Sequence, residues 1–282
     1  MTTVRVMRSA NSEESPFVAK PGQEGHRRFL ENLRLDHGPI DELGSFLLRA
    51  ERAMSDHGVT LYNSPMSELA RVNEVNQQTW KSFSPILDFR LAPLDRTNSY
   101  CVTGRDPSGE VVVLIGGKLI DTGERTLQET ADDQSIYYGQ PHSPSLTQPR
   151  CVMTVPVAKH LKGRFNYSGG LWVKPSYRGR GFPAIMERIS RMFALGQWGT
   201  SHAISFVTDE LANSPVLLAY GYKNIQPSYS IVQDGAEAYR GSLIWMEAKA
   251  AIDDMREFGS NGLSKIDRAV IDGRRKDIAA AS

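Results

Sequence analysis

The sequence predicts an α/β fold in which helices flank a mixed sheet. The first observation is a strand–turn–helix unit, in which the apolar run Leu171–Val173 leads through a glycine-bearing turn into an amphipathic helix. That helix places one set of apolar residues on a single face, namely Ile185, Ile189, Met192 and Phe193. The second observation is a hairpin pattern within 99–120, and the third is the alternation of extended and helical patterns along 59–247. With 282 residues, 40% of them hydrophobic, the chain can bury a full core.

The N-terminal part is expected to hold an arm and one helix. Residues 1–25 are polar and aperiodic, which predicts a flexible N-terminal arm. A helical extension is predicted over 26–57, because one face of a helix from about Asp41 to His57 is apolar. Its apolar residues are Leu43, Phe46, Leu47, Ala50 and Met54.

A single domain is predicted over 58–248, with a partly helical tail at 249–282. Its predicted elements are a strand at 59–62, a helix from Ser64-Pro65 to about Ser82, strands at Ser99–Gly104 and Glu110–Ile120, the strand and helix already described, a strand at Ala203–Thr208, a short helix at Ser214–Tyr220, and strands at Tyr229–Gln233 and Tyr239–Glu247. Ser64-Pro65 is a good N-cap and first-turn pair. Residues 122–166 are mostly polar and predict a long functional loop.

The turn from Tyr177 to Gly181 gives the strongest functional signal. A strand that feeds a helix through such a turn presents unpaired main-chain amides at the positive end of a helix dipole, which suits an anion. Arg178 and Arg180 suit it to a diphosphate, and Gly179 lets the main chain approach the ligand without a Cβ. The chain lacks the phosphate-binding motif of P-loop proteins and the glycine order of dinucleotide folds. An ordinary basic surface turn is the alternative.

The run Arg178-x-x-Gly181-x-Pro183 resembles the pyrophosphate-binding signature of the GNAT (N-acetyltransferase) superfamily. That signature begins with Gln or Arg, has Gly at the fourth position and ends with Gly or Ala at the sixth. Pro183 departs from it and removes one N–H that usually binds the cofactor. The order of elements from Val59 onward is also similar to the GNAT core, and 212–222 looks like its closing helix.

The resemblance implies a GNAT-like fold, with a mixed, mostly antiparallel sheet, a splayed central strand pair and flanking helices. It also implies acetyl-CoA or another acyl-CoA as the donor substrate, with pantetheine in the gap between the splayed strands. The implied donor-binding residues are Leu171, Trp172 and Val173 at the pantetheine, Arg178, Gly179, Arg180, Gly181, Phe182 and Pro183 around the diphosphate, and Asn213 in the closing segment.

The implied chemistry is transfer of an acyl group to an amine of a small molecule or a peptide. The enzyme must take a proton from the ammonium group, polarise the thioester carbonyl and protonate the leaving thiolate. The usual tyrosine position falls on Leu217, so Tyr220 is the candidate proton donor, with a packing tyrosine as an equal alternative. Asp209 and Glu210 are candidate bases, although a solvated loop pair explains them as well. An acceptor amine of low pKa would need no base.

Three functional hypotheses follow from these residues. The first is an acyl-CoA-dependent N-acyltransferase. The second is a catalytically degenerate GNAT-like module that binds acyl-CoA or a partner, suggested by Pro183 and Leu217. The third is a nucleic-acid contact built on Arg178, Arg180 and Arg188. The net charge of +1 does not favour this third hypothesis.

The remaining expectations concern location and partners. No segment is long enough to span a bilayer, and no apolar stretch follows Arg5 and Arg8, so we expect a cytoplasmic protein without a secretory signal. Cys101 and Cys151 have no metal-binding spacing and are expected to be reduced core thiols. We expect no nucleic-acid or membrane partner, and a homodimer stays open. His142 and His160 border the expected acceptor pocket, where a structural role is the commoner one for a lone histidine.

Overall fold

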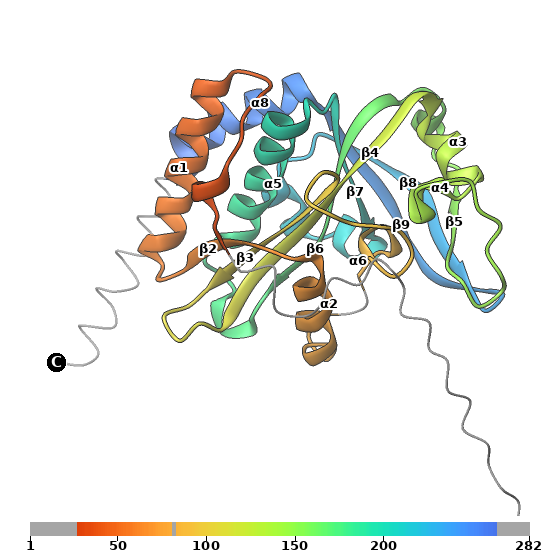
Figure 1. Ribbon diagram of the computed structural model, residues 1–282, viewed down its shortest axis with the longest axis horizontal. Coiled ribbons are helices and arrows are strands. Elements are labelled where there is room, and N and C mark those ends of the chain that lie inside the picture. Colours follow the sequence, from red (N-terminus) through yellow and green to blue (C-terminus); the bar gives the residue numbers. More distant parts are fainter. Residues whose placement is uncertain (1–26, 81–82, 264–282) are drawn as a thin grey trace, which may run out of the picture.

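The computed structural model describes residues 27–80 and 83–263. They form one mixed sheet with helices on both of its faces (Figure 1). The strand order across the sheet is β1-β2-β3-β4-β6-β7-β9-β8-β5. The strands are β1 (Arg27–Arg28), β2 (Thr60–Ser64), β3 (Ser99–Arg105), β4 (Val111–Thr126), β5 (Arg150–Met153), β6 (Lys162–Val173), β7 (His202–Thr208), β8 (Asn224–Gln233) and β9 (Ala236–Glu247). Every neighbouring pair is antiparallel except β6 and β7, which are parallel. The predicted fold class is therefore confirmed.

The central strands β6 and β7 separate after a short paired stretch. They pair only where Phe165–Tyr167 meets His202–Ile204. Beyond it, β6 stays with β4 as far as Val173, and β7 stays with β9 as far as Thr208. The register of β6 against β4 also shifts next to Gly170, which has a φ of +61°. The sheet thus divides into two halves with a gap between them, which is the predicted splay.

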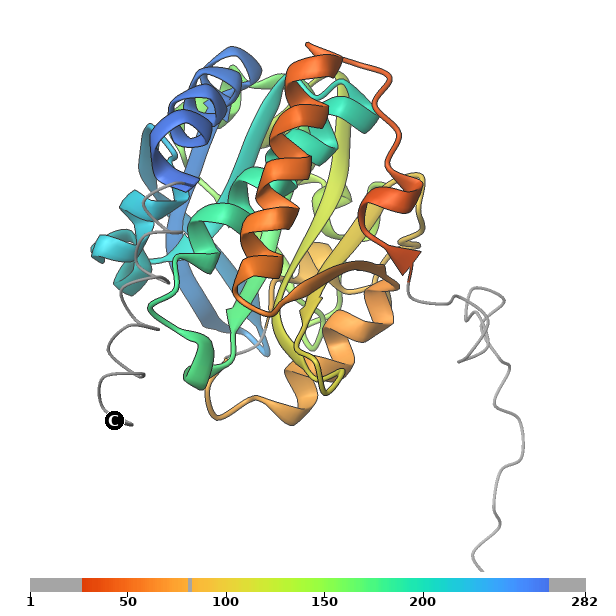
Figure 2. The same cartoon turned by 90° about the vertical axis from the view of Figure 1, so that its left-hand side faces the viewer.

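Helices α1 (Ile40–Asp56), α5 (Phe182–Trp198) and α8 (Ala248–Glu257) lie side by side over one face of the sheet (Figure 2). They share one hydrophobic core with the sheet, which includes Phe46, Met54, Phe182, Ile189, Met192 and Met255. The periodicity that predicted α1 and α5 is therefore confirmed, because the apolar faces lie on the sheet. The predicted N-terminal extension packs into this same core, and the proposed domain division stays a prediction.

The opposite face is covered by α2 (Met66–Val75), η2 (Pro85–Leu87) and the segment 127–161, which share a second core. The helix predicted to reach about Ser82 ends seven residues earlier, because the Asn76 side chain donates to the Val72 carbonyl oxygen at 2.8 Å and closes it. Its N-cap is Pro65 instead of the predicted Ser64, and Ser82 itself lies outside the described residues.

The long loop predicted over 122–166 is wrong, because most of that segment has regular structure. β4 continues to Thr126, where a capping box with Glu129 starts the next helix. The elements that follow are α3 (Leu127–Asp132), α4 (Ser135–Tyr138), β5 and η3 (Pro156–Lys159). The polar pattern concealed β5, since this strand has four residues and depends on pairing with β8 and on burial of Cys151 and Met153.

The remaining elements close the chain. They are η1 (Leu30–Asn32), η4 (Pro175–Tyr177), α6 (Asp209–Ala212), α7 (Pro215–Tyr220) and η5 (Phe258–Gly262). β8 begins five residues before the predicted Tyr229. The predicted arm at 1–25 and the tail beyond 263 lie outside the described residues. Cys101 and Cys151 are free and buried. Within 27–80 and 83–263, no helix has both the length and the apolar character needed to cross a membrane.

Candidate active site

The turn before α5 offers main-chain amides that the protein does not use. The amides of Tyr177 and Arg178 are engaged inside the η4 turn, and the amide of Ala184 donates to the carbonyl oxygen of Gly181 at 3.0 Å. Between them, within the described part of the chain, four amides donate to no protein acceptor: Gly179, Arg180, Gly181 and Phe182. Gly179 and Gly181 have φ values of +79° and +74°, which few L side chains adopt. Four free donors at the start of a 17-residue helix form an arrangement that suits an anion.

The two arginines of the turn are exposed and bond only to neutral main-chain oxygens. Arg178 donates from Nε to the Val173 oxygen at 3.2 Å and from Nη2 to the Thr79 oxygen at 3.4 Å. Arg180 lies over the Tyr177 ring, 4.4 Å from its centroid. Among the described residues, no carboxylate forms a salt bridge with either guanidinium group. Their positive charge therefore stays uncompensated beside the free amides.

The other predicted donor-binding residues have different surroundings. Leu171 is half-buried at the gap between β6 and β7, whereas Trp172 and Val173 are buried in the cores on opposite faces of the sheet. Phe182 is fully buried, and Pro183 is the second residue of α5. The three buried side chains serve packing, which leaves their main chain as the part that a ligand can reach.

Asn213 is exposed at the corner between α6 and α7. Its side-chain nitrogen donates to the Asp209 carbonyl oxygen at 2.7 Å, so this side chain closes α6. A donor-binding role for Asn213 stays a prediction.

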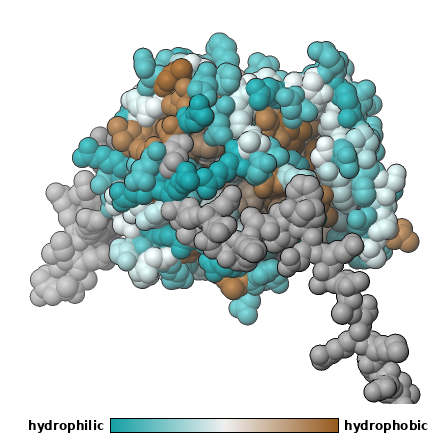
Figure 3. Space-filling model, in the orientation of Figure 1, coloured by the Kyte–Doolittle hydropathy of each residue, from teal (hydrophilic) through white to brown (hydrophobic). Residues whose placement is uncertain are grey.

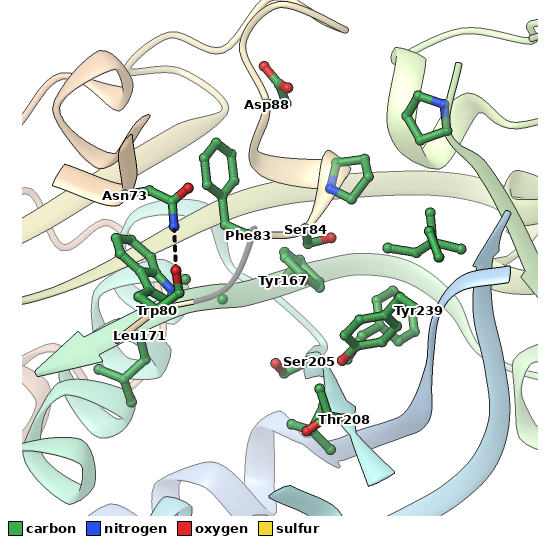
Figure 4. Close-up of a pocket in the computed structure, with 18 of the residues that line it drawn as sticks. Asn73, Trp80, Phe83, Ser84, Asp88, Tyr167, Leu171, Ser205, Thr208 and Tyr239 are labelled. Carbon is green, nitrogen blue, oxygen red and sulfur yellow. Dashed lines mark hydrogen bonds between the residues drawn. The ribbon is translucent and has the colours of Figure 1, made fainter. Parts of the chain in front are cut away.

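A cavity of about 960 Å³ opens where β6 and β7 separate, on the face opposite α5. In the orientation of Figure 1, the molecular surface shows apolar residues between hydrophilic ones near its middle (Figure 3). Figure 4 shows side chains from three parts of the chain around the cavity, with Trp80 and Phe83 on one side, Tyr167 and Leu171 on β6, and Ser205 on β7. The cavity is thus lined by aromatic and aliphatic side chains together with nearly as much polar surface, which includes Asn73, Ser84 and Asp88.

Tyr220 lies on α7 and also lines this cavity. Only 8% of the residue is exposed, and burial raises the pKa of its phenol, with Glu187 and Tyr222 nearby adding to the rise. The hydroxyl has no hydrogen-bond partner among the described residues. A phenol with a raised pKa keeps its proton at neutral pH, so Tyr220 has a proton to give, although it holds that proton more tightly than an ordinary tyrosine, and it is unsuited to act as a base.

Glu187 is a cavity residue that the sequence did not single out. It is buried in α5, and burial raises the pKa of its carboxyl group, while Arg191 and Ser168 oppose the rise. The Ser168 hydroxyl donates to its Oε2 at 3.2 Å. The signal that could have revealed it is a charged run, Glu187-Arg188, within a helix that is apolar on the same side.

The buried ion cluster behind Glu187 removes one candidate from the nucleic-acid hypothesis. Asp254 of α8 accepts hydrogen bonds from Arg188 and Arg191, each at 2.9 Å. Arg188 also lies over the Phe258 ring, 3.9 Å from its centroid. Because this guanidinium group is committed to the core, the third hypothesis, a nucleic-acid contact built on Arg178, Arg180 and Arg188, loses one of its three residues.

The candidate bases from the sequence do not meet at the cavity. Asp209 and Glu210 are exposed at the start of α6, and Asp209 borders a separate hollow of about 410 Å³. The His142 ring lies on Tyr138, with centroids 4.0 Å apart, and His160 is exposed after η3. None of these four lines the larger cavity, whose carboxylates are Glu74, Asp88 and Glu187. Of these three, Glu187 is the buried one, on α5.

Comparisons with known proteins give structural likeness only. No family model and no curated protein sequence matches the chain. The acetyl-CoA complex of NAA60 from Arabidopsis thaliana superposes at a TM-score of 0.43 with 12% identity, covering 68% of this chain and 99% of that one. An uncharacterized protein from Bacillus halodurans superposes at a TM-score of 0.41 with 12% identity, covering 72% of this chain and 91% of that one. Spermidine N-acetyltransferase from Vibrio cholerae superposes at a TM-score of 0.40 with 8% identity, covering 68% of this chain and 95% of that one.

Superpositions of this quality assign neither an activity nor a substrate. The fold itself rests on the sheet of this chain, with its single parallel pair, the split between β6 and β7, and the turn that leads into α5. By these features the chain has a GNAT-like fold, as its sequence predicted.

Proposed function

We propose that this protein is an acyl-CoA-dependent N-acyltransferase, most simply an N-acetyltransferase, acting on an amine of a small molecule or a peptide. One observation supports it above the others: four unengaged main-chain amides lie at the start of α5, beside the split strands. The large cavity reaches the same gap from the opposite face. A donor and an acceptor can therefore approach one another through the sheet.

The donor half of the proposal uses mainly main-chain groups. The amides of 179–182 would bind the diphosphate of coenzyme A, and Arg178 and Arg180 would balance its charge. Ala184 uses its amide within the protein, and Pro183 has none, so the run of available donors ends at Phe182. The free side of β6 from Leu171 to Val173 would bind the pantetheine.

The chemical step is an exchange of a carbon–sulfur bond for a carbon–nitrogen bond. A neutral amine attacks the thioester carbonyl carbon, a main-chain amide of β6 near Leu171 polarises the carbonyl oxygen, and the carbon–sulfur bond breaks. Tyr220 gives its proton to the leaving thiolate. Glu187, or water beside it, takes the proton that the amine loses. Coenzyme A acts here as the carrier of the acyl group that is transferred.

A catalytically degenerate module that only binds acyl-CoA is the second candidate. It is favoured by Leu217, which occupies the usual tyrosine position and is half-buried on α7. Turnover separates the two candidates, because the enzyme releases free coenzyme A when an amine is added and the module does not. A cytoplasmic location and a homodimer remain predictions.

The test of donor binding is the variant Gly181→Glu, measured by calorimetry with acetyl-CoA. The new carboxylate would stand where the diphosphate binds, so affinity should fall at least about a hundredfold. The matched control is Gly123→Glu, because Gly123 is exposed and also has a positive φ, of +55°. This control carries the same charge and the same backbone strain without touching the turn. Equal binding by both variants would reject the donor site.

A further inference from the structure

We propose, building on the proposed function, that the acceptor is a monoamine carrying an aromatic ring, and that the ring lies between aromatic side chains of the large cavity. A volume of about 960 Å³ is at the upper end for drug-sized ligands and exceeds what an acetyl group and a small aliphatic amine require. The acceptor therefore has a substantial body beyond its reactive nitrogen.

Aromatic side chains form two opposite walls of this cavity. Trp80 and Phe83 form one wall, with ring centroids 6.5 Å apart, and Trp80 also stacks on Trp172 at 6.0 Å. The sheet forms the other wall with Tyr167, Phe206, Tyr229 and Tyr239. In Figure 4, Trp80 and Phe83 lie on one side of the hollow, with Tyr239 across it. A planar ring fits between such walls.

The wall on the sheet is rigid. Phe206 and Tyr229 stack with centroids 3.8 Å apart and an interplanar angle of 4°, and Tyr239 meets Tyr229 edge-on at 5.9 Å. The Tyr229 hydroxyl bonds to the hydroxyl of Tyr137 at 2.5 Å, which ties the wall to α4. Tyr239 is half-buried, so it is the ring of this wall that a ligand can reach most readily. A preorganised wall binds a ring without a cost of ordering.

The charges of the cavity suit one ammonium group. Asp88 is already paired with Arg90 at 2.7 Å, so it offers little to a second cation. Glu187 lies by the split strands and is only loosely paired with Arg191, at 3.8 Å. Glu74 is exposed at the rim. An acceptor with one amine can place it near Glu187 and its ring against Tyr239. The other charges of a polyamine would meet only Asp88, which Arg90 already neutralises, and Glu74, which is exposed to water and therefore screened.

The first test is calorimetry on the full chain saturated with free coenzyme A. The probes are 2-phenylethylamine, spermidine and a tetra-alanine peptide. We expect 2-phenylethylamine to bind at least about tenfold more tightly than either of the others, because it alone gains a stacked ring. Equal or tighter binding of spermidine or the peptide overturns the inference, and so does a lack of binding by all three.

The second test uses the wall itself. Tyr239→Leu should weaken binding of 2-phenylethylamine about fivefold and leave spermidine unchanged, because a ring contact is lost. Tyr239→Phe is the control and should stay within about twofold of the wild type, since the ring is kept. A Leu variant that binds both amines like the wild type, or that loses both equally, overturns the inference. If coenzyme A itself fails to bind, the proposed function fails; if it binds and no ring preference appears, only this inference fails.

Discussion

The two faces of the split sheet present candidate binding sites of different kinds. Beside α5, the candidate donor site consists of consecutive main-chain amides from Gly179 to Phe182 with two arginines. On the other face, the candidate acceptor cavity collects side chains from positions as distant as Trp80 and Tyr239. A main-chain site depends on backbone conformation, while a side-chain cavity depends on residue identity. The donor side is therefore the more constant and the acceptor side the more adaptable.

The two faces also bury charge differently. Behind α5, the carboxylates of Glu187 and Asp254 face Arg188 and Arg191, so the charges balance. On the cavity face, Lys118 is 6% exposed and donates to the Ile136 carbonyl oxygen at 3.4 Å. No carboxylate pairs with it within the described part of the chain, and burial lowers its pKa to about 8. The donor face thus pairs its buried charges, whereas the cavity face buries a cation that has no carboxylate partner among the described residues.

Removing the Asp254 carboxylate, which Arg188 and Arg191 share, should leave uncompensated positive charge in the core beside α5. Asp254→Ala leaves two buried guanidinium groups without their partner, and the free energy of unfolding should fall by about 3–5 kcal/mol. Urea denaturation measures it. The matched control on the same helix is Asp253→Ala, whose exposed side chain pairs with Lys249 and Arg256, and its effect should stay below about 1 kcal/mol. Similar losses for both would mean that the cluster does not stabilise α5.

Removing the hydroxyl of Tyr220 should separate chemistry from binding at the boundary of the two faces. Tyr220→Phe should lower kcat about a hundredfold, because the leaving thiolate loses its proton donor. The affinity for acetyl-CoA should not change. Tyr222→Phe is the control, because this variant also removes a tyrosine hydroxyl, but one that is engaged with Ser168 at 3.0 Å. Its kcat should fall less than that of Tyr220→Phe. Normal turnover by the Tyr220→Phe variant would show that Tyr220 serves packing alone.

Replacing Lys118 should test the charge on the cavity face. Its pKa is lower in the folded protein than the usual 10.5, so between about pH 8 and 10.5 the unfolded chain binds more protons and stability rises with pH. Below pH 8 the cost of the buried charge is fully present. Lys118→Met should therefore be about 2 kcal/mol more stable at pH 7 and should lack the rise. Thermal unfolding at a series of pH values measures both, and a destabilised variant contradicts the prediction.

The smallest expected effect concerns the support of the aromatic wall. Tyr137→Phe leaves the Tyr229 hydroxyl without its partner, which should cost about 1 kcal/mol of unfolding free energy. Acetyl-CoA binding should be unaffected, because the turn before α5 does not touch α4. If Tyr137→Phe also weakened acetyl-CoA binding, the two faces would not be independent.

The donor face could be predicted from the sequence because its features are local. The apolar periodicity of α1 and α5, the positive-φ glycines and the strand before them all lie within short windows. The free main-chain amides of 179–182 could also be predicted, because the amides at the start of a helix have no acceptor within that helix. The helix predicted from about Asp41 to His57 has nearly these ends, Ile40 and Asp56, because its apolar period is clear.

The acceptor face could not be predicted in the same way. β5 has four residues and becomes a strand only through β8, whose partner residues lie far along the chain. Glu187 becomes a cavity residue only because β6 and β7 separate above α5. Trp80 and Tyr239 line the same cavity only through tertiary packing, which no spacing in the chain reveals. These features need the assembled sheet.

The path of 127–161 has one more consequence. This segment leaves the half of the sheet that contains β4, crosses to the outer edge of the other half as β5, and returns as β6. It joins the two halves across the split, in addition to the short ladder between β6 and β7, so a large separation of the halves would have to rearrange this segment as well. We therefore expect the main chain of the two halves to shift little when ligands bind.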